Sequence, residues 1–508
     1  MMRWSGAKGN RVTALCAGVA LAAGCAVAQG THAATAETKP DYEAYGARLA
    51  PAPVDPVIAA ALRHISAARI EKTITTLVGF GTRSTLSSME TYLPPGQGVT
   101  AAADWVYGQF EQISKECGGC LEVKRDTFVQ PVSGRVARPT TITNVYAILR
   151  GSEPKGSMFL VTGHYDSRNS EIMDDHGAAP GANDDASGVA VSLECARVLS
   201  QASRKGHWPG TLVFVAVAGE EQGLYGSGHL AKLASTEGWH LDGVLNNDIV
   251  GGNTTPGDTL QKKDRVRVFS EGVPATATPE QARRIRALGL VDDAPSRQLA
   301  RAMDEAARTY LNGLHGEERF SVFLVARPDR YLRGGDHMSF NQQGFAAVRV
   351  TEWREDFNHQ HQNVRVDNGV QYGDLVKFVD FRYVANVARL NAATLATLAA
   401  SPGAPRELKI YAKHLENGTT LSWEAPDPAP TGAFHYKLVW RETDAAQWQY
   451  GISIPASEAE SVTVPVSKDN VTFGVCTVDT AGHRSLVTTV QVPAGNPTAA
   501  KRGWETAR

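Results

Sequence analysis

Five short polar motifs, each at the end of an apolar run, carry histidines and carboxylates along this chain. In order they are Gly163-His164-Tyr165-Asp166, residues 181–188, residues 219–223, Asn247-Asp248 and Gln360-His361-Gln362. One histidine or one pair of glutamates would carry little information. His, Asp, Glu, Asp and His in one chain, most of them leaving a predicted buried strand, are rare by chance. The set predicts a hydrolase in which metal ions activate a water molecule.

Composition places the chain among ordinary globular proteins. It has 508 residues, of which 42% are hydrophobic and 20% are charged, enough for a large core and more than one domain. The formal net charge is −2 and there is no long basic block. Nucleic acids and acidic membrane surfaces are therefore disfavoured as partners.

The N-terminus has the pattern of a secretory signal. Three basic residues precede the apolar stretch 12–27, and Ala26-Val27-Ala28 offers a small-residue cleavage site. Residues 1–28 are therefore predicted to be a signal peptide, and the mature protein is expected to be secreted or periplasmic with no membrane span. A lipoprotein-like pattern before Cys25 leaves a lipid-anchored form as the alternative.

Four cysteines remain after this cleavage: Cys117, Cys120, Cys195 and Cys476. Export permits disulfides, and the first two could close a small loop. A zinc half-site is the alternative for this pair, although no second Cys or His pair lies near it. Cys195 lies in an apolar helical pattern and is expected to be a buried small residue.

Changes in pattern along the chain predict its domains. Residues 29–55 are rich in Ala, Thr and Pro and are predicted to be a linker. In residues 56–400 apolar runs alternate with helical patterns, which predicts an α/β three-layer sandwich with a mainly parallel central sheet. Residues 401–495 carry alternating strands and turns, which predict a small all-β sandwich of the fibronectin type III kind. The polar tail, residues 496–508, is predicted to be disordered.

Open α/β sheets hold their sites just past the carboxyl ends of the strands. His164 follows one predicted strand, the pair Glu220-Glu221 follows the next, and Asp248 follows a third. The predicted fold therefore brings these side chains to one edge of the sheet.

The residue types favour zinc. Zinc takes histidine nitrogen and carboxylate oxygen, and a catalytic zinc leaves a position for water. Two zinc ions about 3.5–4 Å apart can clamp both oxygens of a reacting centre. A minimal set gives each ion one histidine and one carboxylate, with a further carboxylate shared. The motifs supply two histidines and three carboxylates for two Zn²⁺ ions.

Neighbouring carboxylates are expected to differ in role. Asp166 lies two residues after His164, so on a strand it points the same way and can hold the ring N–H. Asp184 precedes a helix, whose N-terminus favours a carboxylate. Glu220 and Glu221 cannot serve identically; if one binds metal, the other can act as the general base.

The ordered motifs resemble those of the secreted di-zinc aminopeptidases, family twenty-eight of the metallopeptidases. The resemblance covers roughly residues 60–400. The family's His-x-Asp, Asp-Asp-Ala-Ser-Gly, Glu-Glu, Asp, Asp-His-x-x-Phe and C-terminal His elements match, in order, His164-Tyr165-Asp166, residues 184–188, Glu220-Glu221, Asp248, Asp336 to Phe340, and His361.

This resemblance implies a division of labour among the ligands. His164 and Asp248 would hold one zinc ion, and Glu221 and His361 would hold the other. Asp184 would bridge the two ions, and the peptide bond that follows it would be cis.

The resemblance also implies the supporting groups. Glu220 would be the general base, and Asp166 and Asp336 would support the ligands without binding metal themselves. One departure concerns the last motif, which usually reads His-Thr-x-x-Asp but here continues from His361 as Gln-Asn-Val-Arg. His359 is therefore a rival ligand.

The resulting hypothesis is an exported zinc metallopeptidase that removes N-terminal residues from peptides or proteins. Three alternatives stay open: a carboxypeptidase of the same superfamily, a glutaminyl cyclase-like enzyme with one zinc, and a non-catalytic binding protein on this fold. The intact ligand set argues against the last two. The C-terminal domain is a candidate for binding a surface or polymer.

Overall fold

The computed structural model describes residues 40–252, 257–313, 319–412, 416–458 and 461–492. The predicted signal peptide with Cys25 and the predicted tail 496–508 lie outside these ranges. Among the helices described there, none combines the length and the apolar character needed to cross a bilayer.

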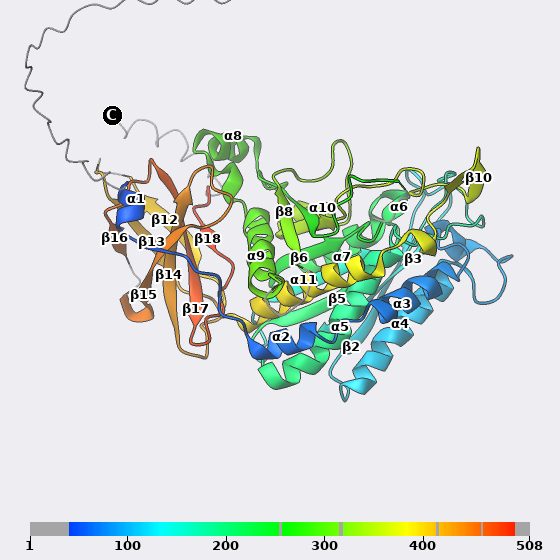
Figure 1. Cartoon of the computed structure of the whole chain (residues 1–508), viewed down its shortest axis with the longest axis horizontal. Coiled ribbons are helices and arrows are strands. Elements are labelled where there is room, and N and C mark those ends of the chain that lie inside the picture. Colours follow the sequence, from blue (N-terminus) through cyan, green and yellow to red (C-terminus); the bar gives the residue numbers. More distant parts are fainter. Residues whose placement is uncertain (1–39, 253–256, 314–318, 413–415, 459–460, 493–508) are drawn as a thin grey trace, which may run out of the picture. The chain divides into compact units, whose positions relative to one another are not determined.

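A mixed eight-stranded sheet forms the centre of the α/β part (Figure 1). Its strand order is β2-β3-β5-β4-β6-β9-β7-β8. The inner strands β5, β4, β6 and β9 run parallel, whereas β2, β3 and β5 pair antiparallel, as do β7 and β9. The bounds are β2 Glu122–Gln130, β3 Thr140–Leu149, β4 Met158–His164, β5 Thr211–Val217, β6 Leu241–Asn247, β7 Arg265–Ser270, β8 Ser321–Val325 and β9 Ala347–Thr351.

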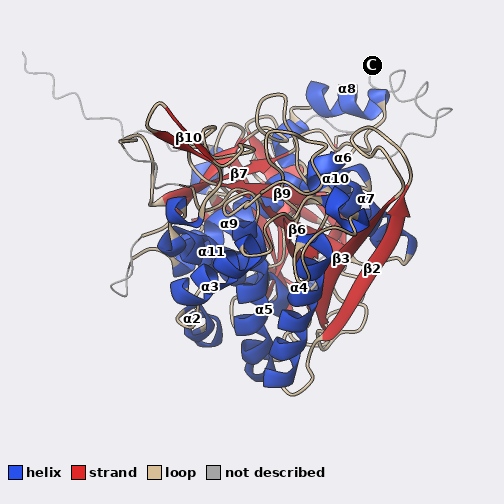
Figure 2. Cartoon of the chain, turned by 90° about the vertical axis from the view of Figure 1, so that its right-hand side faces the viewer, coloured by secondary structure: helices blue, strands red, loops and turns tan. Residues whose placement is uncertain are grey.

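Helices cover both faces of this sheet (Figure 2). One face shares a large apolar cluster with α2 Pro56–Leu62, α3 Ala67–Val78, α4 Gly98–Glu116, α5 Ala186–Gly206, α9 Pro295–Tyr310 and α11 Phe381–Ala400. The other face shares a second cluster with α7 Tyr225–Thr236 and α10 His337–Gln342. Two cores on opposite faces make a three-layer sandwich, which confirms the predicted fold class. Shorter elements are α6 Glu220–Gly223, α8 Pro279–Ala287 and the hairpin of β10 Arg365–Asp367 and β11 Val370–Tyr372.

The central strands are apolar along their whole length because both of their faces are covered. Every residue of β4 and β5 is buried. Parallel strands end at the same edge of the sheet, so His164, the last residue of β4, and Asp248, the residue after β6, reach one edge.

Asp185 fixes the loop that carries Asp184. Its carboxylate accepts the backbone N–H of Gly188 at 2.9 Å, which caps α5, and the backbone N–H of His164 at 3.0 Å. It also accepts the N–H of Ile249, just past β6, at 3.3 Å. One buried side chain therefore joins the start of α5 to the ends of two strands. The Asp184–Asp185 peptide bond is cis, as the resemblance implies.

Two smaller sheets follow, with orders β1-β15-β14-β17-β18 and β12-β13-β16. They share an apolar cluster that includes Trp423, Trp440 and Phe473. The bounds are β1 Ala47–Arg48, β12 Arg406–Tyr411, β13 Thr419–Glu424, β14 Phe434–Glu442, β15 Tyr450–Pro455, β16 Val462–Val464, β17 Val471–Asp479 and β18 Thr488–Thr489.

The segment predicted as a linker, residues 29–55, contains a short helix and a short strand in its second half. After α1 (Asp41–Ala44), β1 joins the C-terminal sheet, with Ala47 opposite Gly451. The Tyr42 hydroxyl donates to Glu442 at 2.8 Å. An Ala- and Pro-rich composition does not reveal a two-residue strand whose partner lies near the other end of the chain.

Polar contacts join the C-terminal sheets to α9 and the turn before it. Arg441 Nη2 lies 2.6 Å from Asp293 Oδ1, and both side chains are buried. Trp448 Nε1 donates to Gln298 at 3.2 Å. The α/β part and the C-terminal sheets therefore form one compact unit.

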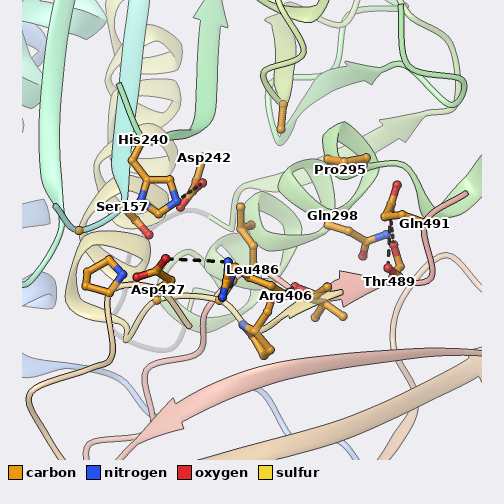
Figure 3. Close-up of a pocket in the computed structure, with 18 of the residues that line it drawn as sticks. Ser157, His240, Asp242, Pro295, Gln298, Arg406, Asp427, Leu486, Thr489 and Gln491 are labelled. Carbon is orange, nitrogen blue, oxygen red and sulfur yellow. Dashed lines mark hydrogen bonds and ion pairs between the residues drawn. The ribbon is translucent and has the colours of Figure 1, made fainter. Parts of the chain in front are cut away.

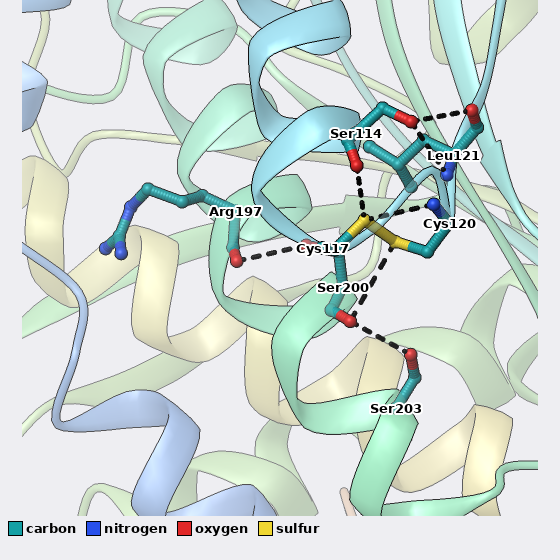
Figure 4. Close-up of a disulfide and its surroundings, with 7 residues drawn as sticks. All are labelled: Ser114, Cys117, Cys120, Leu121, Arg197, Ser200 and Ser203. Carbon is teal, nitrogen blue, oxygen red and sulfur yellow. Dashed lines mark hydrogen bonds between the residues drawn. A yellow bond between two sulfur atoms is a disulfide. The ribbon is translucent and has the colours of Figure 1, made fainter.

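Cys117 and Cys120 form a disulfide in the turn after α4 (Figure 4). The pair is therefore not a zinc half-site. Cys195 is a free, buried cysteine in α5, as the apolar pattern around it predicts.

Candidate metal centre

All five predicted ligands meet at the carboxyl edge of the inner strands. They form two groups of three, His164 with Asp184 and Asp248, and Asp184 with Glu221 and His361. Within each group one ligand atom of every residue lies within 4.8 Å of the others. Asp184 belongs to both groups, so the arrangement is two His–carboxylate pairs around one shared carboxylate.

The first group is built on the ends of β4 and β6. His164 Nε2 lies 3.2 Å from Asp184 Oδ1 and 3.9 Å from Asp248 Oδ1. The other oxygen of Asp248 lies 2.7 Å from Nη1 of Arg349, which is fully buried in β9. Asp248 is thereby held by one oxygen and directs the other toward His164.

The second group joins α6 to the loop before β10. His361 Nε2 lies 2.9 Å from Asp184 Oδ2 and 3.1 Å from Glu221 Oε1. Gln360 donates to Asp184 Oδ2 at 2.9 Å. The two oxygens of Asp184 therefore face different groups, which is the geometry that a bridging carboxylate requires.

The donor atoms fit zinc. His164 Nε2 and Glu221 Oε1 are buried and have no hydrogen-bond partner among the residues that the structure describes. Buried polar atoms without a partner are uncommon because each carries a desolvation cost. A cation in each group would satisfy these atoms, and mixed histidine and carboxylate donors are those that zinc takes.

In these groups the histidines and carboxylates shift one another's protonation. Burial alone would lower the pKa of His361, but Glu221 and Asp184 raise it to about 10. Burial would raise the pKa of Asp184, but the charges of His361 and His164 hold it well below its usual range. The carboxylates therefore favour a positive charge between them, whether it is a proton or a metal ion.

Asp166 contacts the first group and the start of α6. His164 Nδ1 lies 3.1 Å from the Asp166 backbone oxygen and 3.5 Å from its Oδ1. Asp166 Oδ2 accepts the Thr85 hydroxyl at 2.9 Å and the backbone N–H of Glu221 at 3.2 Å. One fully buried carboxylate thus touches a ligand histidine and positions a ligand glutamate.

Glu220 begins α6 and belongs to neither group. Its side chain is half-buried, whereas that of Glu221 is buried. Burial raises the pKa of Glu220 well above its usual range, and the charge of His164 partly opposes this shift. A carboxylate next to the ligands, with a raised pKa and no ligand role, is suited to accept a proton.

Asp336 is fully buried directly before α10, but neither of its carboxylate oxygens has a hydrogen-bond partner in the described part of the chain. Burial raises its pKa to about 7. The supporting role predicted for Asp336 stays a prediction. Its neighbour His337 contacts the Pro328 carbonyl at 2.8 Å through Nε2, a structural contact.

His359 lies outside both groups. Its ring stacks on Phe378 with 3.7 Å between centroids, and its Nδ1 lies 3.5 Å from Asp356 Oδ2. Of the two histidines in this loop, His361 is the one placed against Asp184 and Glu221.

Three residues outside the motifs complete the surroundings. Asp374 accepts the backbone N–H of Asp184 at 2.7 Å, Arg349 pairs with Asp248, and Arg168 pairs with Glu221. Of these three residues, only Arg349 could have been identified from the sequence, because an arginine inside an apolar strand needs a carboxylate partner. Asp374 and Arg168 lie in loops where composition gives no such signal.

A cavity of about 260 Å³ lies away from the metal centre (Figure 3). Its lining includes Ser157, Asp242 and Ala346, which lie at or next to the starts of β4, β6 and β9, together with Arg406 and Asp427. His164 and Asp248 lie at the opposite ends of β4 and β6, so this cavity is not part of the metal centre.

Solved structures with a similar fold include both peptidases and cyclases. An aminopeptidase from Legionella pneumophila, LapA, covers 69% of this chain and 76% of its own, with 20% identity and a TM-score of 0.47. A glutaminyl cyclase from Porphyromonas gingivalis covers 65% of this chain and 98% of its own, with 17% identity and a TM-score of 0.43. Likenesses this distant do not separate the two activities.

Sequence relatives are closer. Residues 144–368 match Peptidase family M28. A "Probable zinc metalloprotease" of Pyrenophora teres f. teres is 41% identical over 443 residues, covering 87% of this chain and 88% of the relative. Another from Pyricularia oryzae is 42% identical over 439 residues, covering 85% and 84%. The chain belongs to peptidase family M28, a family of zinc metallopeptidases.

Proposed function

We propose that this zinc peptidase binds two zinc ions and acts as an exported aminopeptidase that removes N-terminal residues from peptides. The observation that carries the proposal is the position of Asp184. Its Oδ1 faces His164 and its Oδ2 faces His361, and each histidine has its own second carboxylate. One carboxylate shared between two His–carboxylate pairs suits two zinc ions, with one ion in each group.

The proposed mechanism assigns roles to the residues of this chain. His164 with Asp248, and His361 with Glu221, would each hold one zinc ion beside the shared Asp184. Two such ions would polarise the scissile carbonyl and lower the pKa of a water molecule. Glu220 takes the proton of the attacking water and passes it to the leaving amine. Asp166 holds Glu221 and contacts His164, so that the ligands keep their directions through the reaction.

The complete ligand set and Glu220 support a two-zinc exopeptidase over two of the three alternatives. A glutaminyl cyclase-like enzyme with one zinc would not need a second complete donor group. A non-catalytic protein would be expected to lack a ligand or the base, and both groups and Glu220 are intact. A carboxypeptidase of the same superfamily remains the rival, because it uses the same ligand types.

Substrates blocked at one end distinguish the two exopeptidases. The full chain should release the first residue of a peptide whose carboxyl end is amidated, and should leave a peptide with an acetylated N-terminus intact. A chelator should abolish both turnover and the two equivalents of zinc measured by elemental analysis. Cleavage of only the N-acetylated peptide would assign a carboxypeptidase, and a fully active metal-free protein would end the proposal.

Export and partners belong to the same proposal. The basic start, apolar stretch and small-residue site of residues 1–28 favour removal of a signal peptide. The two smaller sheets, with one shared core, favour a fibronectin type III-like module, whose proposed role is to bind a surface or polymer. Mature protein recovered from the medium or periplasm should begin at Gln29, whereas a lipid-anchored form should begin at Cys25.

A further inference from the structure

A cavity of about 410 Å³ lies where β7 and β8 end, between the first turn of α9 and helix α10. Two charged residues line it, Glu271 directly after β7 and Arg297 in α9. Strand β7 runs antiparallel to β9, with Ser270 opposite Val348. The end of β7 therefore lies at the edge of the sheet where β9 begins, opposite to the edge that carries the candidate zinc ligands.

The guanidinium of Arg297 has one edge without hydrogen bonds. The residue is only 6% exposed, and its Nη1 donates to the Ser270 hydroxyl at 3.0 Å and to the Val325 carbonyl at 3.2 Å. Nε and Nη2, the two nitrogens of the other edge, donate to no group within the described ranges. Asp292 Oδ1 lies 3.6 Å from Nε, but the other oxygen of Asp292 pairs with Arg301 at 2.5 Å. An edge of this kind can bind a carboxylate through two parallel N–H···O bonds.

Glu271 offers an acceptor in the same cavity. Its Oε2 accepts the backbone N–H of Ala275 at 3.0 Å, the one hydrogen bond that the described part of the chain gives this carboxylate. Burial raises the pKa of Glu271 to about 7, and the charge of Arg297 opposes this shift only in part. A positive group beside Oε1 would stabilise the charged carboxylate. The cavity therefore has a place for one anionic and one cationic group.

We propose that this cavity binds a free α-amino acid with an apolar side chain, whose carboxylate pairs with Arg297 and whose ammonium pairs with Glu271. A zwitterion has no net charge, so it matches one arginine beside one glutamate. The volume lies within the range of about 300–1,000 Å³ that is usual for small-molecule sites. The remaining walls suit an apolar side chain, because they include Val273, Val291, Pro328 and Met338.

The proposed function supplies the ligand, because an aminopeptidase releases free amino acids, and the inference rests on the proposed function in this respect alone. An amino acid also has groups that bind zinc, so the test must separate this cavity from the metal centre. A chelator makes the separation, because it removes zinc ions and leaves Glu271 and Arg297 at the other edge of the sheet.

Calorimetric titration of the full chain with L-leucine tests the inference, first with zinc bound and then after chelator treatment. The chelator-treated chain should still bind leucine. N-acetyl-L-leucine lacks the ammonium and L-leucinol lacks the carboxylate, so each should bind about 10–100-fold more weakly, the usual effect of losing a hydrogen bond between charged groups. L-aspartate should also bind more weakly, because its second carboxylate would face the apolar walls.

Glu271→Gln removes the negative charge but keeps an amide oxygen for the Ala275 N–H. It should weaken leucine binding by about 10–100-fold and leave zinc content and turnover unchanged. Glu280→Gln is the matched control, because Glu280 is exposed in the first turn of α8 outside the cavity lining, and this variant should bind leucine as the wild type does. Arg297→Lys keeps the charge but not the paired N–H groups, and should also weaken binding. Circular dichroism checks each variant, and Glu271→Gln alone decides if Arg297→Lys fails to fold.

Three results would overturn the inference: no leucine binding by the chelator-treated chain, equal binding of leucine, its N-acetyl derivative and leucinol, or full affinity in Glu271→Gln. Leucine that binds only the zinc-loaded chain would lie at the metal ions, and the proposed aminopeptidase would stand. Absence of zinc binding or of peptide cleavage would instead overturn the proposed function, and leucine binding by the chelator-treated chain would remain measurable.

Discussion

Arg349 holds Asp248 from behind, with 2.7 Å between Nη1 and Oδ2, and neither side chain has appreciable exposure to solvent. The same Nη1 lies 3.6 Å from Asp329 Oδ2 and donates to the Gly334 carbonyl at 3.1 Å. A Cβ on Gly335 would lie 2.4 Å from this nitrogen, so only glycine allows the chain to pass so close. The arginine therefore ties the segment before α10 to a candidate zinc ligand.

Replacing Arg349 by Met should destabilise the fold strongly. The change leaves Asp248 and Asp329 buried without their shared cation, and loss of one partner from a buried ion pair typically costs about 3–5 kcal/mol. Urea unfolding of the chelator-treated protein measures this loss. Arg354→Met removes a half-exposed arginine that pairs with Asp258, and should cost about 0–1 kcal/mol. A loss below about 1 kcal/mol in Arg349→Met would contradict the buried-pair argument.

Glu220→Gln and Glu221→Gln should affect different quantities, kcat in the first variant and zinc content in the second. An amide cannot accept the proton of water, so Glu220→Gln should lower kcat by about 10²–10⁴-fold while zinc content stays the same. Glu221 lies 3.1 Å from His361 in the second group, so Glu221→Gln should lower zinc content instead. Elemental analysis beside steady-state kinetics separates the two effects. If the phenotypes are exchanged, the base and ligand roles are exchanged.

The ligand motifs could be found from the sequence because each is a short run of polar residues next to an apolar run. Buried inner strands appear as continuous apolar runs, and ligands that follow such runs, such as His164 and Asp248, must reach the same edge of a parallel sheet. The choice between His359 and His361 needed the structure, since both lie in one loop and only the backbone path decides which ring turns toward Asp184.

The supporting residues could not be found in the same way. Asp374 lies far from Asp184 in sequence and reaches its backbone N–H only through tertiary packing. Asp336 lies in a motif that resembles the family's, yet its carboxylate has no hydrogen-bond partner within the described ranges. Strand β1 adds two residues to a sheet whose other strands begin after residue 430, and no periodicity is detectable in so short a segment.

His483 should make stability depend on pH. Its Nδ1 lies 2.8 Å from Asp479 and its Nε2 lies 2.9 Å from Asp55, the N-cap of α2. Burial lowers the pKa of His483, but the two carboxylates raise it above its usual value overall. A raised pKa in the folded state contributes stability below the unfolded value of about 6.5, and this contribution is lost as pH rises through the folded pKa.

His483→Gln should therefore cost more at pH 6 than at pH 9. The expected loss at pH 6 is about 1.5–3 kcal/mol, the usual range for a hydrogen bond to a charged group. Urea unfolding at both pH values gives the difference. His64→Gln, at an exposed position, is the control for replacing a histidine elsewhere in the chain. An equal loss for His483→Gln at both pH values would mean that His483 contributes packing and not charge.

Ending the chain at Ser401 should weaken the fold without removing the metal centre. All five candidate ligands precede this residue, so zinc content and kcat of the folded fraction should be retained. The truncation nevertheless leaves Asp293 without Arg441, its partner at 2.6 Å, and removes the Trp448 contact with Gln298 on α9. A buried carboxylate that loses its arginine must be hydrated or protonated, which lowers the free energy of unfolding. The melting temperature of the truncated chain should therefore be lower than that of the full chain. Arg441→Met in the full chain isolates the ion pair from the other contacts and should lower it in part. A truncated chain with an unchanged melting temperature would show that the C-terminal sheets add no stability to the α/β part.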